Sequence, residues 1–298
     1  VIGLNGDRIV NLRMQYARPR KLDQATELLD ALGTGAMVIA GGQELMPYLN
    51  YGRISPSIFM DISGLAELEG IEETAQGISI GALTVHRQIQ INPVINSALP
   101  LLSFAAAQIG GGRQVHNRGT IGGNIVAMHA LYDIAPALIA LRAQIEVAGN
   151  QGLRTVPLTE LLVETDHDLG TKTLLTRIVI PAMDPASGWA YEKLKITEGS
   201  YGSANAAAIV LRKPDGDLQV DLVVGAVAEQ PVDLTGPLSE RLRDNPDTDL
   251  DEQIDAVCQA VITDPISDQR GHAEYRKAMA CVVAKRAVAA AIKKIKTS

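Results

Sequence analysis

The sequence has few aromatic residues, few cysteines and a deficit of positive charge. Aromatic residues make up 3% of its 298 residues, with two Phe and one Trp, so hydrophobic cores must be built from Ala, Leu, Ile and Val. The two cysteines, Cys258 and Cys281, lie in apolar or helical surroundings, which predicts buried small side chains. Two cysteines argue against a disulfide framework, and an iron–sulfur cluster within this chain would normally need about four cysteine ligands. The net charge of -7 and the pI near 5.3 argue against a nucleic-acid-binding protein, which needs a basic face.

Long apolar runs and export signals are also missing. The most apolar long stretch, IVAMHALYDIAPALIAL (125–141), is interrupted by Asp133 and Pro136 and predicts no membrane span. The first residues, VIGLNGDRIVNLR, carry charges where a secretory signal would have an apolar core. With 46% apolar and 20% charged residues, the chain is long enough for two or three compact units. We therefore predict a cytoplasmic enzyme or subunit with no membrane span and no nucleic-acid partner.

The common nucleotide and catalytic signatures are absent too. No residues fit the P-loop G-x-x-x-x-G-K-[ST] or the dinucleotide fingerprint G-x-G-x-x-G. The five histidines show no metal-ligand spacing, and DHD at 166–168 is more typical of a solvated loop than of a cation site. Tyr201 and Ser203 flank Gly202, but no His or carboxylate partner for a nucleophile is evident. We predict no catalytic side chain and no metal site on this chain.

Hydrophobic periodicity predicts two units in the first part of the chain. Residues 21–33 have apolar side chains at helical spacing and end at Gly33, and short strands are expected at 37–40 and 58–62, which together make a small α/β unit. From Gly77 a strand precedes helices that begin near Thr84 and at LPLLSFAAAQIG. The runs QIEVAG, RTVPL and LLTRIVIP are β-branched and separated by polar turns, as in an antiparallel sheet.

A third unit follows a linker that begins at Pro181. WAYEKLKI, AAAIVLRK and LQVDLVVGAVAE read as strands, with a hairpin turn at PDGD, and helices complete the chain. The last helix places four residues on one apolar stripe: Ala278, Val282, Ala289 and Ile292. The pattern predicts an α+β fold with units at 1–62, 63–183 and 184–298, and lacks the regular βαβα alternation of a doubly wound fold.

Two glycine-rich stretches point to a ligand. AGGQEL at 40–45, the first glycine loop, follows a predicted strand, and RGTIGGN at 118–124 is the second glycine segment. Without Cβ atoms, glycines let a ligand approach backbone N–H groups, which can form a concave nest for anions. Taken singly, the first is equally typical of a tight turn, and Asn124 of the second could simply cap the next helix. Together they suit the diphosphate of a dinucleotide held from two sides between subdomains.

The motifs resemble those of one family over nearly the whole chain. IAGGQELMP, ISIGALTVHRQI, QVHNRGTIGGNI, DIAPALIAL, YEKLK and EYRKAMACVVAKRA are similar to segments of the FAD-binding medium subunits of the molybdenum hydroxylases, a group that includes carbon monoxide, xanthine, and aldehyde or N-heterocycle dehydrogenases. TIGGN with its upstream Gln-x-x-Asn-Arg is highly specific, whereas AGG alone is not. The resemblance implies a two-subdomain FAD-binding (PCMH-type) fold followed by a C-terminal domain of antiparallel strands plus helices.

The resemblance also implies which residues bind FAD. The first wall of the diphosphate site would be Val38, Ile39, Ala40, Gly41, Gly42, Gln43, Glu44 and Leu45. The second wall would be Thr120, Ile121, Gly122, Gly123 and Asn124. Gly111 would lie near the ring or ribityl region, Asp133 would accept hydrogen bonds from the adenosine part, and Leu175 and Lys193 would lie near the adenine and the isoalloxazine respectively. The residues alone leave an alternative for each of two positions. Asp133 could be a helix cap instead of a cofactor ligand, and Lys193 could be a solvent-facing charge.

The sequence departs from the family pattern at positions that bear on this site. Gln43 and Glu44 replace the more usual Thr or His and Asp, Asn or Ser, and Glu44 places an anion beside a proposed anion site, so its carboxylate should point away or bond to an N–H group. His116 stands where the family has a fixed positive charge, and is expected to be a loop residue bonded to backbone.

As a member of this family, the chain would be the FAD-carrying oxidoreductase subunit of a heterohexameric enzyme, a dimer of heterotrimers. A large subunit would hold the molybdenum cofactor, and a small subunit would hold two iron–sulfur clusters that deliver electrons to FAD for an external acceptor. Three alternatives stay open at this point: a self-contained FAD-dependent oxidase or reductase of the same wider fold, a noncatalytic scaffold that has lost FAD, and, disfavoured by the missing fingerprint, an NAD-binding dehydrogenase.

Overall fold

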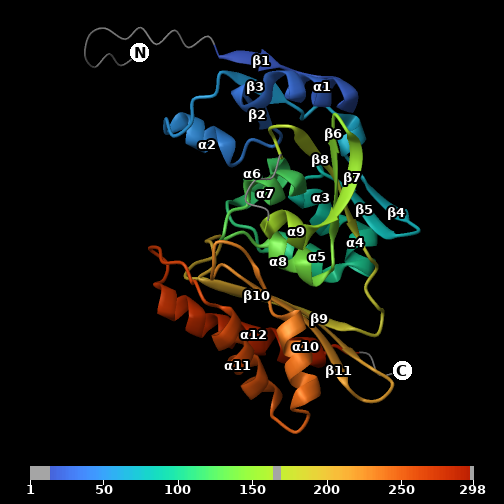
Figure 1. Cartoon of the computed structure of the whole chain (residues 1–298), viewed down its shortest axis with the longest axis vertical. Coiled ribbons are helices and arrows are strands. Elements are labelled where there is room, and N and C mark those ends of the chain that lie inside the picture. Colours follow the sequence, from blue (N-terminus) through green and yellow to red (C-terminus); the bar gives the residue numbers. More distant parts are fainter. Residues whose placement is uncertain (1–13, 164–168, 296–298) are drawn as a thin grey trace.

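The computed structural model describes residues 14–163 and 169–295, which form three sheets stacked along the long axis of the molecule (Figure 1). The predictions at 1–13 and 166–168 lie outside the described residues. Each sheet takes its strands from one continuous stretch of chain, and the predicted boundaries after residues 62 and 183 fall between sheets. The division into three domains stays a prediction.

The first sheet is small and parallel. Its order is β1 (Gln15–Ala17), β3 (Ile58–Asp61) and β2 (Ala36–Ile39). Helix α1 (Leu22–Leu32) buries Ala25 and Leu29 and ends at Gly33, whose φ of 51° is the left-handed conformation that glycine adopts readily. The first glycine loop leaves β2 and leads into the short helix α2 (Leu45–Asn50). The predicted α/β unit is therefore present.

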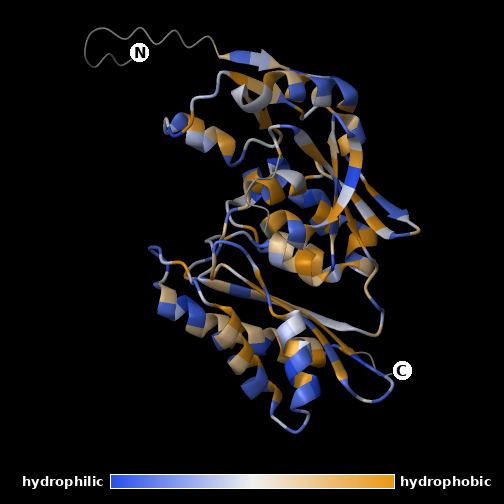
Figure 2. Ribbon diagram, in the orientation of Figure 1, coloured by the Kyte–Doolittle hydropathy of each residue, from blue (hydrophilic) through white to orange (hydrophobic). Residues whose placement is uncertain are grey.

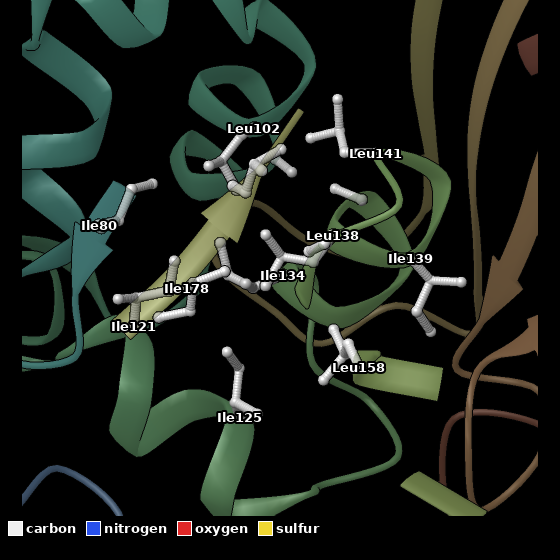
Figure 3. Packing of buried hydrophobic residues seen from close by; sticks show 14 of the residues in the cluster. Ile80, Leu102, Ile121, Ile125, Ile134, Leu138, Ile139, Leu141, Leu158 and Ile178 are labelled. Atoms are coloured by element: carbon white, nitrogen blue, oxygen red, sulfur yellow. The ribbon is translucent and has the colours of Figure 1, made fainter. Parts of the chain in front are cut away.

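The second sheet has five antiparallel strands. Its order is β4 (Ile71–Thr74), β5 (Gly77–Gly81), β8 (Thr173–Ile180), β6 (Gln144–Gly149) and β7 (Gly152–Pro157). Seven short helices belong to this part of the chain: α3 (His86–Ile91), α4 (Pro93–Ala98), α5 (Pro100–Ala107), α6 (Gly112–Arg118), α7 (Ile121–Ala127), α8 (Ile134–Ala140) and α9 (Leu158–Val163). Their core is aliphatic, as the scarcity of aromatics requires. Figure 3 shows Ile80 of β5, Ile178 of β8, Ile121 and Ile125 of α7, and Ile134 and Leu138 of α8 packed into one interior.

The third sheet is antiparallel and carries apolar residues on both faces. Its order is β12 (Val232–Asp233), β11 (Leu218–Gly225), β10 (Ala204–Arg212) and β9 (Gly188–Leu194). Along β10, Ala206 and Ala208 face one core while Ala207 and Ile209 face the other, since side chains alternate along a strand. Helices α10 (Thr235–Asp244), α11 (Leu250–Val261) and α12 (Ala273–Ile292) cover the outer face, and α8 and α5 pack on the inner one (Figure 1). The α+β prediction is confirmed.

The apolar stripe predicted for the last helix is mostly not its buried face. Ala278 and Ala289 of α12 are exposed, and the residues that pack on β9 and β10 are instead Ala280, Ala284, Ala287 and Ala291 with their neighbours. Apolar residues occur all round this helix, so periodicity does not select a face, and packing against the sheet determines which residues are buried. Figure 2 shows hydrophobic residues distributed along α12 as well as on the central helices. Within the described parts of the chain, no helix combines the length and apolarity that crossing a membrane requires.

Candidate cofactor-binding site

A cavity of about 810 Å³ lies where loops of the three sheets meet. This volume is in the upper range for sites that bind small molecules and cofactors. All but two of the predicted FAD-binding residues line it: Val38, Ile39, Ala40, Gly41, Gly42, Gln43, Glu44, Leu45, Gly111, Thr120, Gly122, Gly123, Asn124, Asp133 and Leu175. The structure thus brings together residues from 38 to 175 around one cavity.

The backbone of the first glycine loop is shaped by two glycines. Gly42 has a φ of 69°, and a Cβ atom built on Gly41 would lie 2.0 Å from the carbonyl oxygen of Arg118. The loop can therefore lie against the end of α6 only with glycine at position 41. The side-chain amide of Gln43 donates to the Gly41 carbonyl oxygen at 3.2 Å, which ties the loop to itself.

The N–H groups of this loop are open to a ligand. Among the described residues, the N–H groups of Gly41, Gly42, Gln43 and Glu44 find no hydrogen-bond acceptor in the protein. Buried or half-buried N–H groups are nearly always bonded, so a run without protein partners beside a cavity indicates that something else accepts from them. A phosphate oxygen is a suitable acceptor, because successive N–H groups form a nest for anions.

The second glycine segment differs from the prediction. Residues from Ile121 onward form α7, and the helix is capped by Thr120, whose hydroxyl accepts from the Gly123 N–H at 3.2 Å, so the N-cap is not Asn124. The N–H groups of Ile121, Gly122 and Asn124 donate to carbonyl oxygens of Thr84, Ala82 and Thr120 at 2.9, 2.9 and 3.0 Å. This segment therefore supplies no free backbone nest.

Glycine is required in the second segment for packing. A Cβ on Gly122 would lie 2.7 Å from the Cβ of Ala82, so α7 can approach the end of β5 only without a side chain there. Ile121 is fully buried and belongs to the hydrophobic core, so it does not line the cavity (Figure 3). Asn124 does line it, and its Oδ1 is buried with no partner in the described protein.

Asp133 and Lys193 form a buried ion pair between the second and third sheets. The Lys193 Nζ donates to Asp133 Oδ2 at 2.8 Å and to the Gln108 carbonyl oxygen at 3.0 Å, and the Tyr191 hydroxyl donates to Asp133 Oδ1 at 2.9 Å. Both charged side chains are nearly inaccessible, at 2% and 3% exposure. Burial raises the pKa of Asp133 and the Lys193 charge opposes that rise. Lys193 is therefore not a solvent-facing charge, and the Asp133 side chain, although at the start of α8, makes no cap bond.

This pairing also bears on the two roles predicted for these residues. An extended dinucleotide has its adenosine and isoalloxazine at opposite ends, and side chains 2.8 Å apart cannot serve both ends. The assignments of Asp133 to one end and Lys193 to the other therefore cannot both hold. Asp133 lines the cavity and Lys193 does not. Lys193 therefore influences the cavity by fixing the position of the Asp133 carboxylate and balancing its charge. Gly111, with a φ of 86°, lines the cavity before α6, and Leu175 lines it from β8.

Sequence reasoning missed several side chains that line the cavity. Three of the chain's seven tyrosines, Tyr48, Tyr132 and Tyr201, do so, as does His129, whose ring stacks on Tyr132 and Tyr201 at 4.9 and 5.3 Å. Because aromatics are scarce, tyrosines close to Gly-rich or predicted ligand positions were a usable signal. The Tyr132 hydroxyl donates to the Glu44 carboxylate, so Glu44 bonds to a phenol and not to an N–H group.

Two further histidines, His86 and His116, lie at or beside the cavity. His86, the first residue of α3, lines it and is 2% exposed, and its Nδ1 has no partner among the described residues. Burial and the neighbouring His116 lower the pKa of His86 to about 4, so it is neutral at pH 7. His116 bonds through Nδ1 to the Gln90 side-chain amide and through Nε2 to the Ile109 carbonyl oxygen, at 2.9 and 2.7 Å. It is bonded as predicted, but in helix α6 and not in a loop.

These features fit a dinucleotide such as FAD. One wall of the cavity offers unpartnered N–H groups. The buried Asn124 Oδ1 and His86 Nδ1 atoms lack partners that a ligand's hydroxyl or N–H groups would supply. No cluster of three or more His, Cys, Asp or Glu side chains within residues 14–163 and 169–295 is placed to hold a metal ion. The residues present therefore suit an organic cofactor.

Comparison with known proteins also indicates that this chain binds FAD. Residues 12–183 match the FAD binding domain in molybdopterin dehydrogenase, and residues 189–291 match the CO dehydrogenase flavoprotein C-terminal domain. The carbon monoxide dehydrogenase medium chain of Hydrogenophaga pseudoflava is 34% identical over 280 residues, which cover 94% of this chain and 97% of that one. The 6-hydroxypseudooxynicotine dehydrogenase complex subunit alpha of Paenarthrobacter nicotinovorans is 36% identical over 204 residues, covering 67% and 68% of the two chains.

A solved structure shares the whole fold. A chain of the carbon monoxide dehydrogenase from Hydrogenophaga pseudoflava that lacks the Mo-pyranopterin moiety of the molybdenum cofactor superposes with a TM-score of 0.86 at 33% identity, covering 95% of this chain and 99% of that one. The two matched domains and this superposition confirm the two-part architecture of an FAD-binding portion followed by a C-terminal domain. The chain therefore belongs to the family of FAD-binding medium subunits of the molybdenum hydroxylases, and it is an oxidoreductase subunit.

Proposed function

We propose that this chain binds FAD in the cavity and passes electrons from iron–sulfur clusters on a small partner subunit to an external acceptor. The run of unpartnered N–H groups in the first glycine loop carries the proposal, because it is the feature of the cavity that selects a phosphate-bearing ligand. Bound FAD would supply the ability to take electrons singly and to release them to a different acceptor.

The residues of this chain would bind and orient the cofactor. The N–H groups of residues 41–44 would bind the diphosphate, and Leu175 would contact the adenine from β8. Asn124 would accept a hydrogen bond through its unpartnered Oδ1. Asp133, held by Lys193 and Tyr191, would present a carboxylate of fixed orientation to the ligand.

The other redox centres would lie on partner subunits. Cys258 and Cys281 are buried in α11 and α12 against the third sheet and are too few to hold a cluster. We infer a small subunit with two iron–sulfur clusters, a large subunit with the molybdenum cofactor, and a dimer of such heterotrimers. The similar structure from Hydrogenophaga pseudoflava is part of a carbon monoxide dehydrogenase, an enzyme that uses a molybdenum cofactor. This similarity supports a partner subunit that holds molybdenum.

Two measurements test the proposal. The purified chain, titrated with FAD, is expected to quench flavin fluorescence and retain the flavin through gel filtration, whereas Gly41→Ala is expected to retain none, because its Cβ would displace the loop. Gly35→Ala, with open space around its Cβ, is the matched control. Purification of the native complex should then give flavin, iron and molybdenum together, at a mass near that of a dimer of heterotrimers.

The same measurements separate the alternatives. A chain that, alone and loaded with FAD, oxidises a small substrate at a high rate would be a self-contained flavin enzyme. A chain that binds no flavin under any condition would be a scaffold. Either result contradicts the proposed electron-transfer role.

A further inference from the structure

The Glu44 carboxylate presents a physical conflict within the cavity. It belongs to the same loop as the unpartnered N–H groups that we assign to a diphosphate, and it lines the same cavity. Glu44 occupies the N-cap position of α2, and its carboxylate makes no cap bond to the backbone N–H groups of that helix. The ion pairs of the described residues do not include Glu44. Something other than a cation or the loop therefore holds the carboxylate.

One phenol bonds to it and a second lies close by. The Tyr132 hydroxyl, 88 positions further along the chain, donates to Glu44 Oε2, and the Tyr48 phenol of α2 lies near enough to the same carboxylate for Glu44 to raise the Tyr48 pKa. The pKa of Tyr132 is raised, first by burial and then by its bond to Glu44, and the pKa of Tyr48 is raised chiefly by Glu44. Both phenols therefore stay protonated and remain donors over the pH range in which the carboxylate is ionised.

The Tyr132 ring is itself fixed in place. It stacks on His129 with centroids 4.9 Å apart and planes 22° apart, and lies 6.1 Å from the Tyr201 ring. Tyr201 in turn lies under the guanidinium of Arg270 at 5.2 Å. Because the Tyr132 ring packs against two other rings, its rotamer is already restricted, and its hydroxyl loses little further entropy when it forms a hydrogen bond.

We propose that Tyr132, assisted by Tyr48, is a positioning residue that holds the Glu44 carboxylate away from the N–H groups of the first glycine loop. The inference rests on the proposed binding of FAD at that loop. Without the phenols, the carboxylate would have the N–H groups of its own loop as its nearest free donors. Bonded there, it would occupy the phosphate site and repel the phosphate charge, so the chain would compete with its own cofactor.

A double-mutant cycle on the full-length chain tests this. The measured quantity is the Kd for FAD, from fluorescence quenching at fixed ionic strength, for wild type, Tyr132→Phe, Glu44→Gln and the double variant. Tyr132→Phe keeps the ring and its stacking, and is expected to weaken FAD binding about tenfold, the size of effect that a hydrogen bond to a charged group supports. In the Glu44→Gln background the same change should alter Kd by less than about twofold, because the charge that needs positioning is gone.

The controls separate this role from structural damage. Tyr275→Phe removes the hydroxyl of a tyrosine in α12 that does not line the cavity, and should leave the Kd for FAD unchanged. Tyr48→Phe lies on a more exposed helix, so it keeps the fold and should weaken FAD binding by a smaller factor than Tyr132→Phe.

Three results would overturn the inference. Equal weakening by Tyr132→Phe in the wild-type and Glu44→Gln backgrounds would mean that Tyr132 contacts the ligand directly. Unchanged binding by both phenylalanine variants would mean that the carboxylate needs no positioning. If wild type itself binds no FAD, the proposed function fails and the inference with it, and the wild-type titration identifies that case before any variant is compared.

Discussion

Replacing Lys193 by methionine would remove the cation from a buried ion pair while keeping a side chain of similar length. The Asp133 carboxylate would then retain its bond from the Tyr191 hydroxyl but lose the charge 2.8 Å away. Breaking a buried pair by removing one partner typically costs about 3–5 kcal/mol, because the remaining charge is left uncompensated. For a chain of this size about 1 kcal/mol corresponds to about 2 °C in Tm, so a decrease of roughly 6–10 °C is expected in the cofactor-free protein.

The effect should depend on pH with a definite sign. Burial already raises the pKa of Asp133, and Lys193 is the first of the influences that lower it, so its removal raises the pKa further. A carboxyl group whose pKa is higher in the folded than in the unfolded chain binds protons more tightly when folded, and stability then increases as pH falls through the folded pKa. The Lys193→Met destabilisation should therefore be largest at about pH 8 and shrink towards about pH 5.

Lys195→Met is the matched control. Lys195 pairs with Glu198 at the same 2.8 Å, but Glu198 is 92% exposed, and exposed pairs contribute about 0–1 kcal/mol. Thermal unfolding followed by circular dichroism at the two pH values measures both variants. A Lys193→Met decrease no larger than that of Lys195→Met, or one that is equal at the two pH values, would refute the reasoning.

Three further predictions concern single groups. Gly41→Ala should lower Tm as well as abolish FAD retention, because its Cβ would lie 2.0 Å from a carbonyl oxygen, and an unaltered Tm would show that the loop moves freely; Gly35→Ala is again the control. The neighbouring Cys258 thiol lowers the pKa of Cys281, so Cys258→Ala should move the pH midpoint of Cys281 alkylation upward, and an unmoved midpoint would contradict that influence. Burial lowers the pKa of His86 to about 4 from 6.5, so the unfolded chain takes up its proton first and stability should fall between pH 6.5 and 4; His86→Phe should flatten that decline in a urea-unfolding series.

The parts of the fold that follow from the sequence are those with a strong local signal. Strands β10 and β11 are predictable because a Pro-Asp-Gly-Asp turn separates two apolar runs, and α1 because its apolar spacing ends at a glycine. The buried face of α12 is not predictable, because Ala and Val surround the helix and the neighbouring sheet makes the choice. The helix that begins at Ile121 is hard to predict because it contains two glycines, and glycine disfavours helices. At Gly122 the close packing that glycine allows compensates for this cost.

For the cavity, sequence similarity located the backbone but not the side-chain partners. The first glycine loop and Asp133 line the cavity as expected. The bond between Tyr132 and Glu44 and the pair between Asp133 and Lys193 join residues 88 and 60 positions apart, and no local pattern encodes such contacts. These contacts form because loops from different sheets converge in the folded chain, so they can be seen only in the structure.

The two glycine-rich stretches look alike in the sequence but solve different physical problems. In the first, the N–H groups have no protein partners, so in our proposal the phosphates of the ligand supply the acceptors. In the second, the N–H groups of residues 121–124 are already bonded, and Gly122 permits contact between α7 and Ala82, which positions the Asn124 side chain at the cavity. A charge placed in the first stretch therefore competes directly with the ligand's phosphates, whereas a charge near the second would act only through packing. This difference explains why Glu44 needs partners that restrain it, and why the two tyrosines supply them from outside its own loop.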